Sequence, residues 1–240
     1  MHTIWVISKR ELSGFFDSLM AYIIIVVFLG LSGFFTWLSS NNIFFSGQAQ
    51  LFGFFGISYW TLFFFIPAIT MRSLAEEKKT GTIELLATKP ITELQIVVGK
   101  WLASWILIAL SLAPTLIYYI TLMNLGNVDH GGIWGGYVAL LLISAVYVAI
   151  GIFTSSITNN QIVAFILALF VSFFFQLLFD VMAPVLPSAL SNFASYLSFS
   201  SHFEIMSRGV FALDNALYFV SVTAIGIILA TASLKRRVWS

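Results

Sequence analysis

The sequence predicts an all-α, polytopic membrane protein with six transmembrane helices, and two observations support that fold class. Charged residues make up only 9% of the 240 residues and hydrophobic residues 60%, whereas a soluble domain carries roughly 25% charged residues. The charges are also unevenly placed, because none occurs between Asp17 and Arg72, or between Asp214 and Lys235. The bilayer must therefore surround most of the protein surface, and the backbone polar groups must be paired within helices.

The spans follow from the charge-free stretches. A helix needs about 20 apolar residues to cross the bilayer. The stretches after Asp17 and after His130 are about twice that length, and polar breaks at 39–48 and 154–161 divide each of them in two. Six spans are therefore expected, at about 19–39, 51–71, 101–123, 133–153, 162–181 and 215–234.

Lysine and arginine give the orientation, because they accumulate in cytoplasmic loops. Six spans place both termini and the 72–100 loop on one side, which then holds every Lys and Arg except Arg208. The sequence predicts a multi-pass protein of the cytoplasmic (inner) membrane with both termini in the cytoplasm. The first apolar run is interpreted as an uncleaved span, since it exceeds a signal-peptide core and no small-x-small cleavage site follows it.

Residues 3–17 are predicted to form an amphipathic helix lying flat at the headgroup level, here called the elbow helix. Its apolar residues fall within about one third of the helical wheel: these are Ile4, Trp5, Leu12, Phe15 and Phe16. The charged residues Lys9, Arg10 and Asp17 lie mainly off that arc. Such a segment binds at a membrane interface. The alternative is a frayed tail with chance amphipathicity.

The 72–100 loop is the one long, charged segment on the cytoplasmic side. Gly81 is expected to break a helix there, Thr82 to cap a new short helix and Pro90 to end it. Thr92 and Gln95 have the spacing of a capping box that opens the helix into the third span. The predicted shape is a short helix held across the membrane surface between two long helices. The alternative is a structured connector without a partner.

The segment 182–214 on the outside is rich in aromatic residues, so short helices that re-enter the outer leaflet are expected there. Pro184 and Pro187 should end the fifth span. Ser201 to Glu204 has the spacing of a capping box, which predicts a helix running towards Phe211. The alternative is an interfacial loop packed on the bundle.

Several chemistries are disfavoured. No ionisable residue lies mid-span, which argues against ion-coupled transport. The pair Gly99-Lys100 lacks the other residues of a phosphate loop, so the chain is not expected to hydrolyse ATP. With no cysteines, a lone Asp129-His130 pair and a net charge of +1, we expect no catalytic residues, no metal site, no cofactor and no nucleic-acid partner.

The motif Gly30-Leu31-Ser32-Gly33 is similar to the nucleophile motif of intramembrane serine proteases. A serine nucleophile needs a base, and none of the three histidines lies within a predicted span. The favoured interpretation is small residues that let two helices approach closely.

The cytoplasmic loop also carries a resemblance to a known family. Its residues Arg72, Glu76-Glu77-Lys78, Thr80-Gly81-Thr82, Glu84-Leu85-Leu86, Pro90 and Gly99-Lys100 resemble the signature loop of type-2 ABC exporter permeases. The elbow helix, the six spans and the outside region, including Ser198 to Val210, match that family's plan, so the resemblance covers the whole chain. Within the family the compact form resembles permeases of the gliding-motility and copper-site-maturation type.

The resemblance implies a transmembrane subunit that dimerises with a second copy or a paralogue. Each copy seats its coupling helix on a separate ATPase subunit, two copies of which bind ATP and Mg and drive export or related mechanical work. The implied ATPase contacts are Glu76, Glu77, Gly81, Thr82, Glu84, Leu85 and Leu86. The expected membrane-interface anchors are Trp5, Lys9, Arg10, Arg72, Lys100, Lys235, Arg236 and Arg237. The alternative function is a membrane scaffold that binds other proteins without transport.

Overall fold

The computed structural model describes residues 2–38, 50–82, 91–210 and 212–238, and all regular structure in these ranges is helical. The long helices are α2 (Leu19–Gly33, continued by the π-helical turn Phe34–Leu38), α4 (Phe52–Thr70), α7 (Glu93–Leu112), α9 (His130–Ile157), α10 (Gln161–Phe173) and α14 (Leu213–Val238). After Ala113–Thr115, α7 continues as α8 (Leu116–Leu125), and after the π-helical turn Phe174–Leu178, α10 continues as α11 (Phe179–Met182) and Ala183–Val185.

Six helical segments in the described part of the chain are long and apolar enough to cross a membrane. They are Leu19–Leu38, Phe52–Lys79, Glu93–Leu125, His130–Ile157, Gln161–Val185 and Leu213–Arg236. The predicted all-α fold with six candidate spans is therefore confirmed, and each segment overlaps one predicted span.

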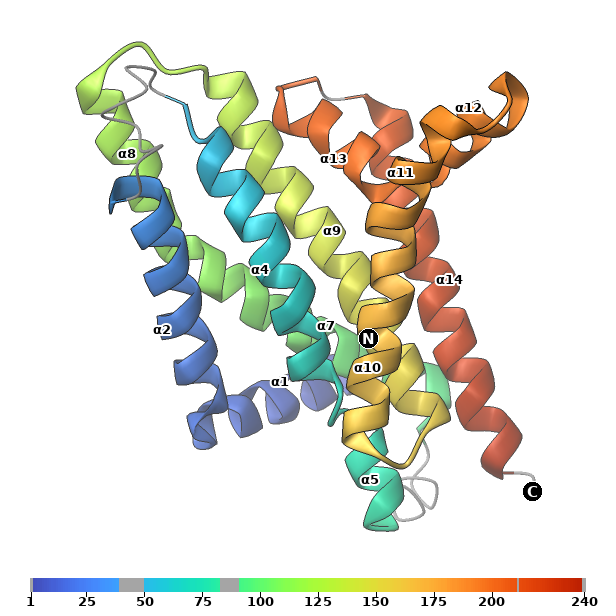
Figure 1. The fold of residues 1–240 in the computed structure, drawn as a ribbon. Coiled ribbons are helices and arrows are strands. Elements are labelled where there is room, and N and C mark those ends of the chain that lie inside the picture. The colour runs from blue at the N-terminus through green and yellow to red at the C-terminus, as the bar shows by residue number, and fades with distance from the viewer. Residues whose placement is uncertain (1, 39–49, 83–90, 211, 239–240) are drawn as a thin grey trace.

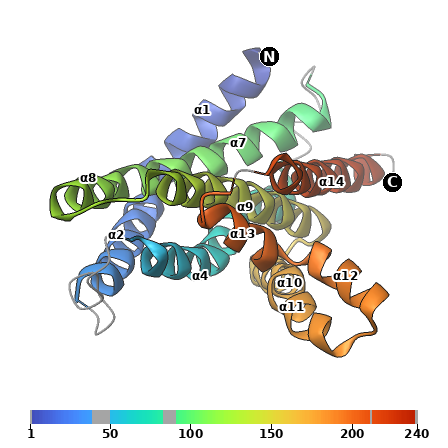
Figure 2. The ribbon, with the colours of Figure 1, turned by 90° about the horizontal axis from the view of Figure 1, so that it is seen from above.

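Helix α9 forms the centre of the bundle. It is the most buried of the six segments. Helices α4, α7, α10, α13 (Phe199–Ser207) and α14 all pack against it, as the view along the bundle shows (Figure 2). Its side chain Tyr147 is fully buried among aromatic neighbours that include Phe63 and Phe199. Any movement of α9 must therefore displace most of the bundle, because close-packed interiors transmit rather than absorb displacement.

Helix α1 (His2–Asp17) is the predicted elbow helix, and it lies across one end of the bundle (Figure 1). The short helix α5 (Ala75–Lys79) and the end of α14 lie at the same end, while α12 (Ser188–Leu197) and α13 (Phe199–Ser207) lie at the other. Under the predicted orientation, the first end is cytoplasmic.

Local side-chain caps start several of these helices. Thr92 and Gln95 form the predicted capping box of α7. The Asp129 carboxylate accepts from the Gly132 N–H at 3.1 Å and so caps α9, which places this acid in a turn between helices. The Asn160 side chain caps α10 by accepting from the Ile162 N–H. Such caps satisfy backbone donors that have no partner in the first helical turn.

The predicted capping box at Ser201 is wrong. Helix α13 starts three residues earlier, and the Ser198 hydroxyl caps it by accepting from the Ser201 N–H. Glu204 pairs instead with Arg208 one turn later, at 3.3 Å. The helix ends at Ser207 and not near Phe211. Two serines three residues apart offer two registers for a cap, and the earlier one is used. The re-entry of α12 and α13 into the bilayer stays a prediction.

Ser32 is fully buried in α2, where its hydroxyl donates to the Leu29 carbonyl of its own helix. Gly33 meets the Tyr118 hydroxyl, because a Cβ there would lie 3.0 Å from that oxygen, whereas a Cβ on Gly30 would have open space. The close approach expected of this small-residue motif therefore holds at Gly33 and not at Gly30.

Candidate functional site

The candidate site is the joint at which α5 meets α9. Helix α4 ends at Thr70, and four residues of turn lead into α5. The fully buried Ser155 hydroxyl of α9 accepts from the N–H groups of Leu74 and Ala75, at 3.0 and 2.9 Å, and donates to the Met71 carbonyl at 3.0 Å. One serine thus satisfies both ends of the turn, where backbone groups would otherwise be buried without partners.

Glycine in α9 brings the two helices close enough for these bonds. Gly151 lies one turn before Ser155 and faces Thr70, and a Cβ at position 151 would overlap the Thr70 side chain. The Thr70 hydroxyl stays within its own helix, donating to the Ile66 carbonyl at 2.8 Å. The absence of a side chain at Gly151 is therefore what lets α4 lie against α9 just before the joint.

A second contact joins α5 to both α9 and α14. The Lys78 ammonium donates to the carbonyl of Ser156, next to the capping serine. The Ser233 hydroxyl of α14 donates to the same carbonyl at 3.0 Å. Helices α5, α9 and α14 are thus linked at one oxygen, at the end of the bundle that carries α1.

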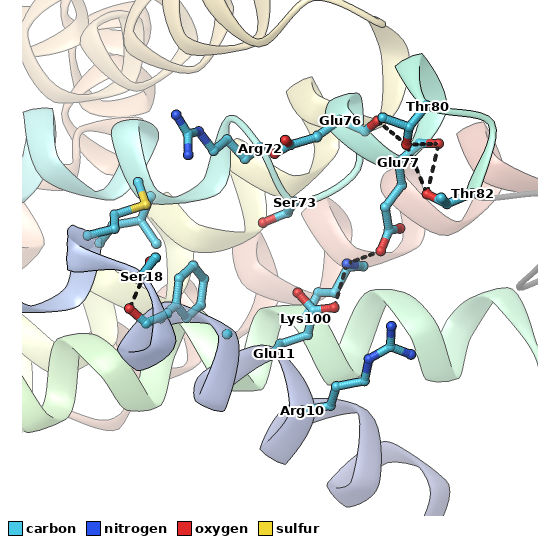
Figure 3. Close-up of a pocket in the computed structure, with 14 residues that line it drawn as sticks. Arg10, Glu11, Ser18, Arg72, Ser73, Glu76, Glu77, Thr80, Thr82 and Lys100 are labelled. Carbon is cyan, nitrogen blue, oxygen red and sulfur yellow. Dashed lines mark hydrogen bonds and ion pairs between the residues drawn. The ribbon is translucent and has the colours of Figure 1, made fainter.

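Lys100 links α5 to the elbow helix and to α7 (Figure 3). Its ammonium lies 2.9 Å from Glu11 of α1 and 2.8 Å from Glu77 of α5, and the lysine is 3% exposed. Glu77 follows the turn after α4, and it shares the Lys100 charge with Glu11. The other carboxylate oxygen of Glu77, Oε2, is buried without a hydrogen-bond partner among the described residues.

A small residue of α7, Gly99, lets helix α1 pack directly on α7. The Ser8 hydroxyl is buried and lies 2.9 Å from the Gly99 carbonyl oxygen and 2.9 Å from that of Ile4, to either of which it can donate. A Cβ on Gly99 would lie 2.6 Å from Ile7. The elbow helix therefore rests directly on the α7 backbone, next to Lys100.

The match that decides the family spans nearly the whole chain. The family model described as ABC-2 family transporter protein covers residues 5–238. The chain belongs to the ABC-2 transporter family. Members of this family are the membrane components of ABC transporters and not their ATPases, so this permease implies an ABC ATPase partner and membrane lipid around it. No curated protein matches the chain.

The implied ATPase contacts of this ABC-2 permease divide into three groups. Glu76 is exposed in the first turn of α5, and Gly81 and Thr82 are exposed just after its end. Gly81 has a φ of 71°, a left-handed conformation that favours glycine, and it breaks the helix as predicted. Glu77 turns inward to Lys100. Glu84, Leu85 and Leu86, with the short helix expected there, lie outside the described residues.

The expected membrane-interface anchors need one correction. Trp5, Lys9, Arg10 and Arg72 are exposed, and Lys235, Arg236 and Arg237 lie in the last turn of α14. Lys100 is not available to headgroups, because its ammonium is buried between Glu11 and Glu77. Its long side chain lies along the α1 contact, and the two carboxylates supply the partners that a buried cation needs.

Sequence reasoning missed Ser155, Ser156 and Ser8. The sequence predicts a polar break between spans at 154–161, but the structure keeps 154–156 in α9 and buries these three residues at the joint. The composition of this run could have indicated such a contact, since three consecutive hydroxyl residues at a helix end can bond to backbone groups of a neighbouring segment. In the described ranges, no group of three or more His, Asp or Glu residues could hold a metal ion.

Proposed function

We propose that this ABC-2 permease is the transmembrane subunit of an ATP-driven exporter of the cytoplasmic membrane. Two copies, or one copy and a paralogue, pair with two copies of a separate ATPase subunit, which binds ATP and Mg. The permease itself performs no chemistry. It converts closure of the ATPase pair into a movement of its spans, for export or for related mechanical work.

The observation that carries the proposal is the joint at α5. This helix projects from the bundle at the end where α1 and the end of α14 also lie (Figure 1). It is tied to α9 through Ser155 and to α7 through Lys100. A protein that pushes on α5 therefore acts on the most buried helix of the bundle, which is how a local contact can bias a two-state structure.

A hollow beside α5 offers room for a docked partner. It has a volume of about 590 Å³ and is lined by Lys79 and by residues 158–162, from the turn after α9 and the start of α10. Because Glu76 and Lys79 are exposed on α5, this helix presents both charges to a partner.

The orientation rests on charge. Lys9, Lys79 and Lys235 all lie at the end of the bundle that carries α1 and α5, and positive residues favour the cytoplasmic side. We therefore place both termini in the cytoplasm, where an ATPase has access to ATP. The narrower assignment to the gliding-motility or copper-site-maturation permeases rests on the resemblance of the sequence alone.

The alternative, a membrane scaffold that binds proteins without transport, makes a different prediction. A scaffold would hold its partner regardless of nucleotide, whereas a permease should change conformation when its ATPase binds and hydrolyses ATP. Spin labels or fluorophores on α1 and α5 would report that change. A complex that contains an ATPase but shows no nucleotide-dependent movement favours the scaffold.

The test is co-purification of the tagged permease from its own host in mild detergent, followed by mass spectrometry. An ATPase with a phosphate loop should accompany the wild-type protein and be lost in Glu76→Lys and in Gly81→Val. Glu204→Lys, the same charge change on an exposed residue at the other end, is the matched control and should retain the ATPase. The mass of the complex gives the copy numbers. A folded, abundant permease without any ATPase would refute the proposal.

A further inference from the structure

The hollow beside the elbow helix is amphipathic. It lies between α1, the end of α4 and α5, and Lys100 forms part of its floor (Figure 3). Apolar side chains, Phe15, Met20 and Ile69, line it together with charged ones. Its volume of about 490 Å³ is within the range of small-molecule sites, roughly 300–1,000 Å³. An occupant must therefore combine an apolar part with a charged part.

The charges that line the hollow are balanced overall but separated. Three basic residues, Arg10, Arg72 and Lys100, face three acidic ones, Glu11, Glu76 and Glu77. Lys100 is fully engaged by Glu11 and Glu77. Because these charges sum to zero, the attraction of a simple anion to Arg72 is offset by its repulsion from the carboxylates. A ligand that carries both signs fits this lining better than either an anion or a cation.

Two opposite charges at the rim lack partners. Arg72 and Glu76 are exposed and four residues apart, yet neither side chain forms an ion pair within the described ranges. A guanidinium presents paired donors that suit a phosphate. Arg72 follows Ile69 by three residues and both line the hollow, so a phosphate at Arg72 would lie beside the apolar lining. A phospholipid, whose acyl chains are attached to a phosphodiester, has its charged and apolar parts in the same arrangement.

The inner wall of the hollow contains an acceptor oxygen that a hydrogen-bond donor of a ligand could satisfy. Glu77 Oε2 is buried and unpartnered in the described part of the chain. A nearby N–H donor would satisfy the oxygen, and a positive charge would favour the ionised carboxylate. A primary ammonium supplies both, whereas a quaternary ammonium has no N–H and a glycerol headgroup has no charge beyond its phosphate.

We propose that this hollow binds a zwitterionic phospholipid whose headgroup joins a phosphodiester to a primary ammonium, as in phosphatidylethanolamine. Arg72 binds the phosphate of the headgroup. Glu76 and Glu77 bind its ammonium group. The acyl chains lie over Phe15 and Met20 and continue into the bilayer.

The lipid would bridge elements that are far apart in the sequence. Its headgroup would contact the turn before α5, and its chains would contact α1, so that α1 and α5 are held together by lipid as well as by Lys100. The binding itself does not depend on the proposed transport function, and it can be measured on the permease alone.

The experiment is native mass spectrometry of the full-length permease in detergent, titrated with dioleoyl lipids that carry ethanolamine, choline or glycerol headgroups. The wild type should bind the ethanolamine lipid roughly tenfold more tightly than the other two, the scale of one charge-assisted hydrogen bond. Arg72→Gln should weaken the binding of all three lipids, because each of them carries the phosphate, and Arg72→Lys should keep part of the binding. Glu76→Gln should raise the binding of the glycerol lipid relative to the ethanolamine lipid.

Lys9→Gln is the matched control, because Lys9 is exposed on α1 but does not line the hollow. Equal lipid binding in Lys9→Gln and Arg72→Gln, with both proteins melting like the wild type, overturns the proposal. So does equal or tighter binding of the glycerol lipid by the wild type. Complete displacement by inorganic phosphate would assign the site to free phosphate. If no lipid binds and Arg72 is protected from chemical modification only when the ATPase is added, the hollow is a protein contact.

Discussion

Ser155→Ala should loosen the joint between α5 and α9 without unfolding the bundle. The substitution removes one oxygen from a fully buried position and leaves the N–H groups of Leu74 and Ala75 without their acceptor. Both residues are themselves fully buried. An orphaned buried donor costs roughly 1–3 kcal/mol. For two donors we expect a loss of about 3 kcal/mol, allowing for partial relaxation of the turn.

The loss should be local and is best measured by hydrogen exchange. A change of 1.4 kcal/mol is a factor of about ten in an equilibrium constant, so exchange at the amides of Leu74 and Ala75 should accelerate about a hundredfold. Ser144→Ala is the matched control. Ser144 is equally buried in α9, but its hydroxyl donates only to the Leu140 carbonyl of its own helix, and its removal should leave these two amides unchanged.

Two results would refute this reasoning. If Ser155→Ala and Ser144→Ala change exchange at the turn equally, Ser155 is an ordinary helix serine and does not hold the joint. If exchange rises throughout α9 and not at the turn, the serine stabilises the central helix itself. Thermal unfolding of both variants in the same detergent separates a local opening from a global loss of stability.

Three further predictions concern the same end of the bundle. Gly99→Val should displace α1 from α7 and cost about 1–3 kcal/mol through overpacking, measured by thermal unfolding and by the distance between labels on the two helices. Lys100→Met should cost about 2–3 kcal/mol in unfolding free energy, less than for a fully buried pair because both carboxylates remain partly exposed. Gly151→Ala should lower the melting temperature through overlap with Thr70, and Gly151→Ala with Thr70→Gly should restore it.

Each of these predictions has its own control. Gly30→Val places the same side chain where a Cβ meets nothing within 4 Å, so a loss equal to that of Gly99→Val would show a general intolerance of valine. Adding Glu77→Gln to Lys100→Met should recover part of the loss, and no recovery would mean that the ion pair is not the cause. Failure of the Gly151 double variant to recover would exclude the Thr70 overlap as the reason.

Much of the fold could be predicted because its signals are local. Apolar runs, polar breaks and the Thr92–Gln95 capping box each lie within one short stretch of sequence, and the structure places helices accordingly. Gly81 also ends its helix as expected. The register of the cap at Ser198 could not be predicted, since Ser198 and Ser201 offer similar local chemistry and the packing of α13 on α9 is not visible in the local sequence.

The joint could not be predicted because its partners are far apart along the chain. Ser155 bonds to a turn about 80 positions earlier, and Lys100 reaches Glu11 across 89 positions. A lysine beside a predicted span is typical of a headgroup anchor, and nothing local distinguishes it from one that is buried in an ion pair. Only the placement of α1 on α7 brings the carboxylate to it.

The contact of α5 with α9 and its link to α1 differ in stiffness, and this difference affects how a displacement of α5 would be transmitted. On the α9 side, Ser155 bonds directly to the backbone of the turn, so a short side chain leaves little freedom between the helices. On the α1 side, the link runs through the long side chain of Lys100, whose ammonium can follow Glu77 by changing rotamers. We therefore expect α5 and α9 to move as one unit and α1 to lag behind. A conformational change in the transporter should then be larger between α1 and α5 than between α5 and α9.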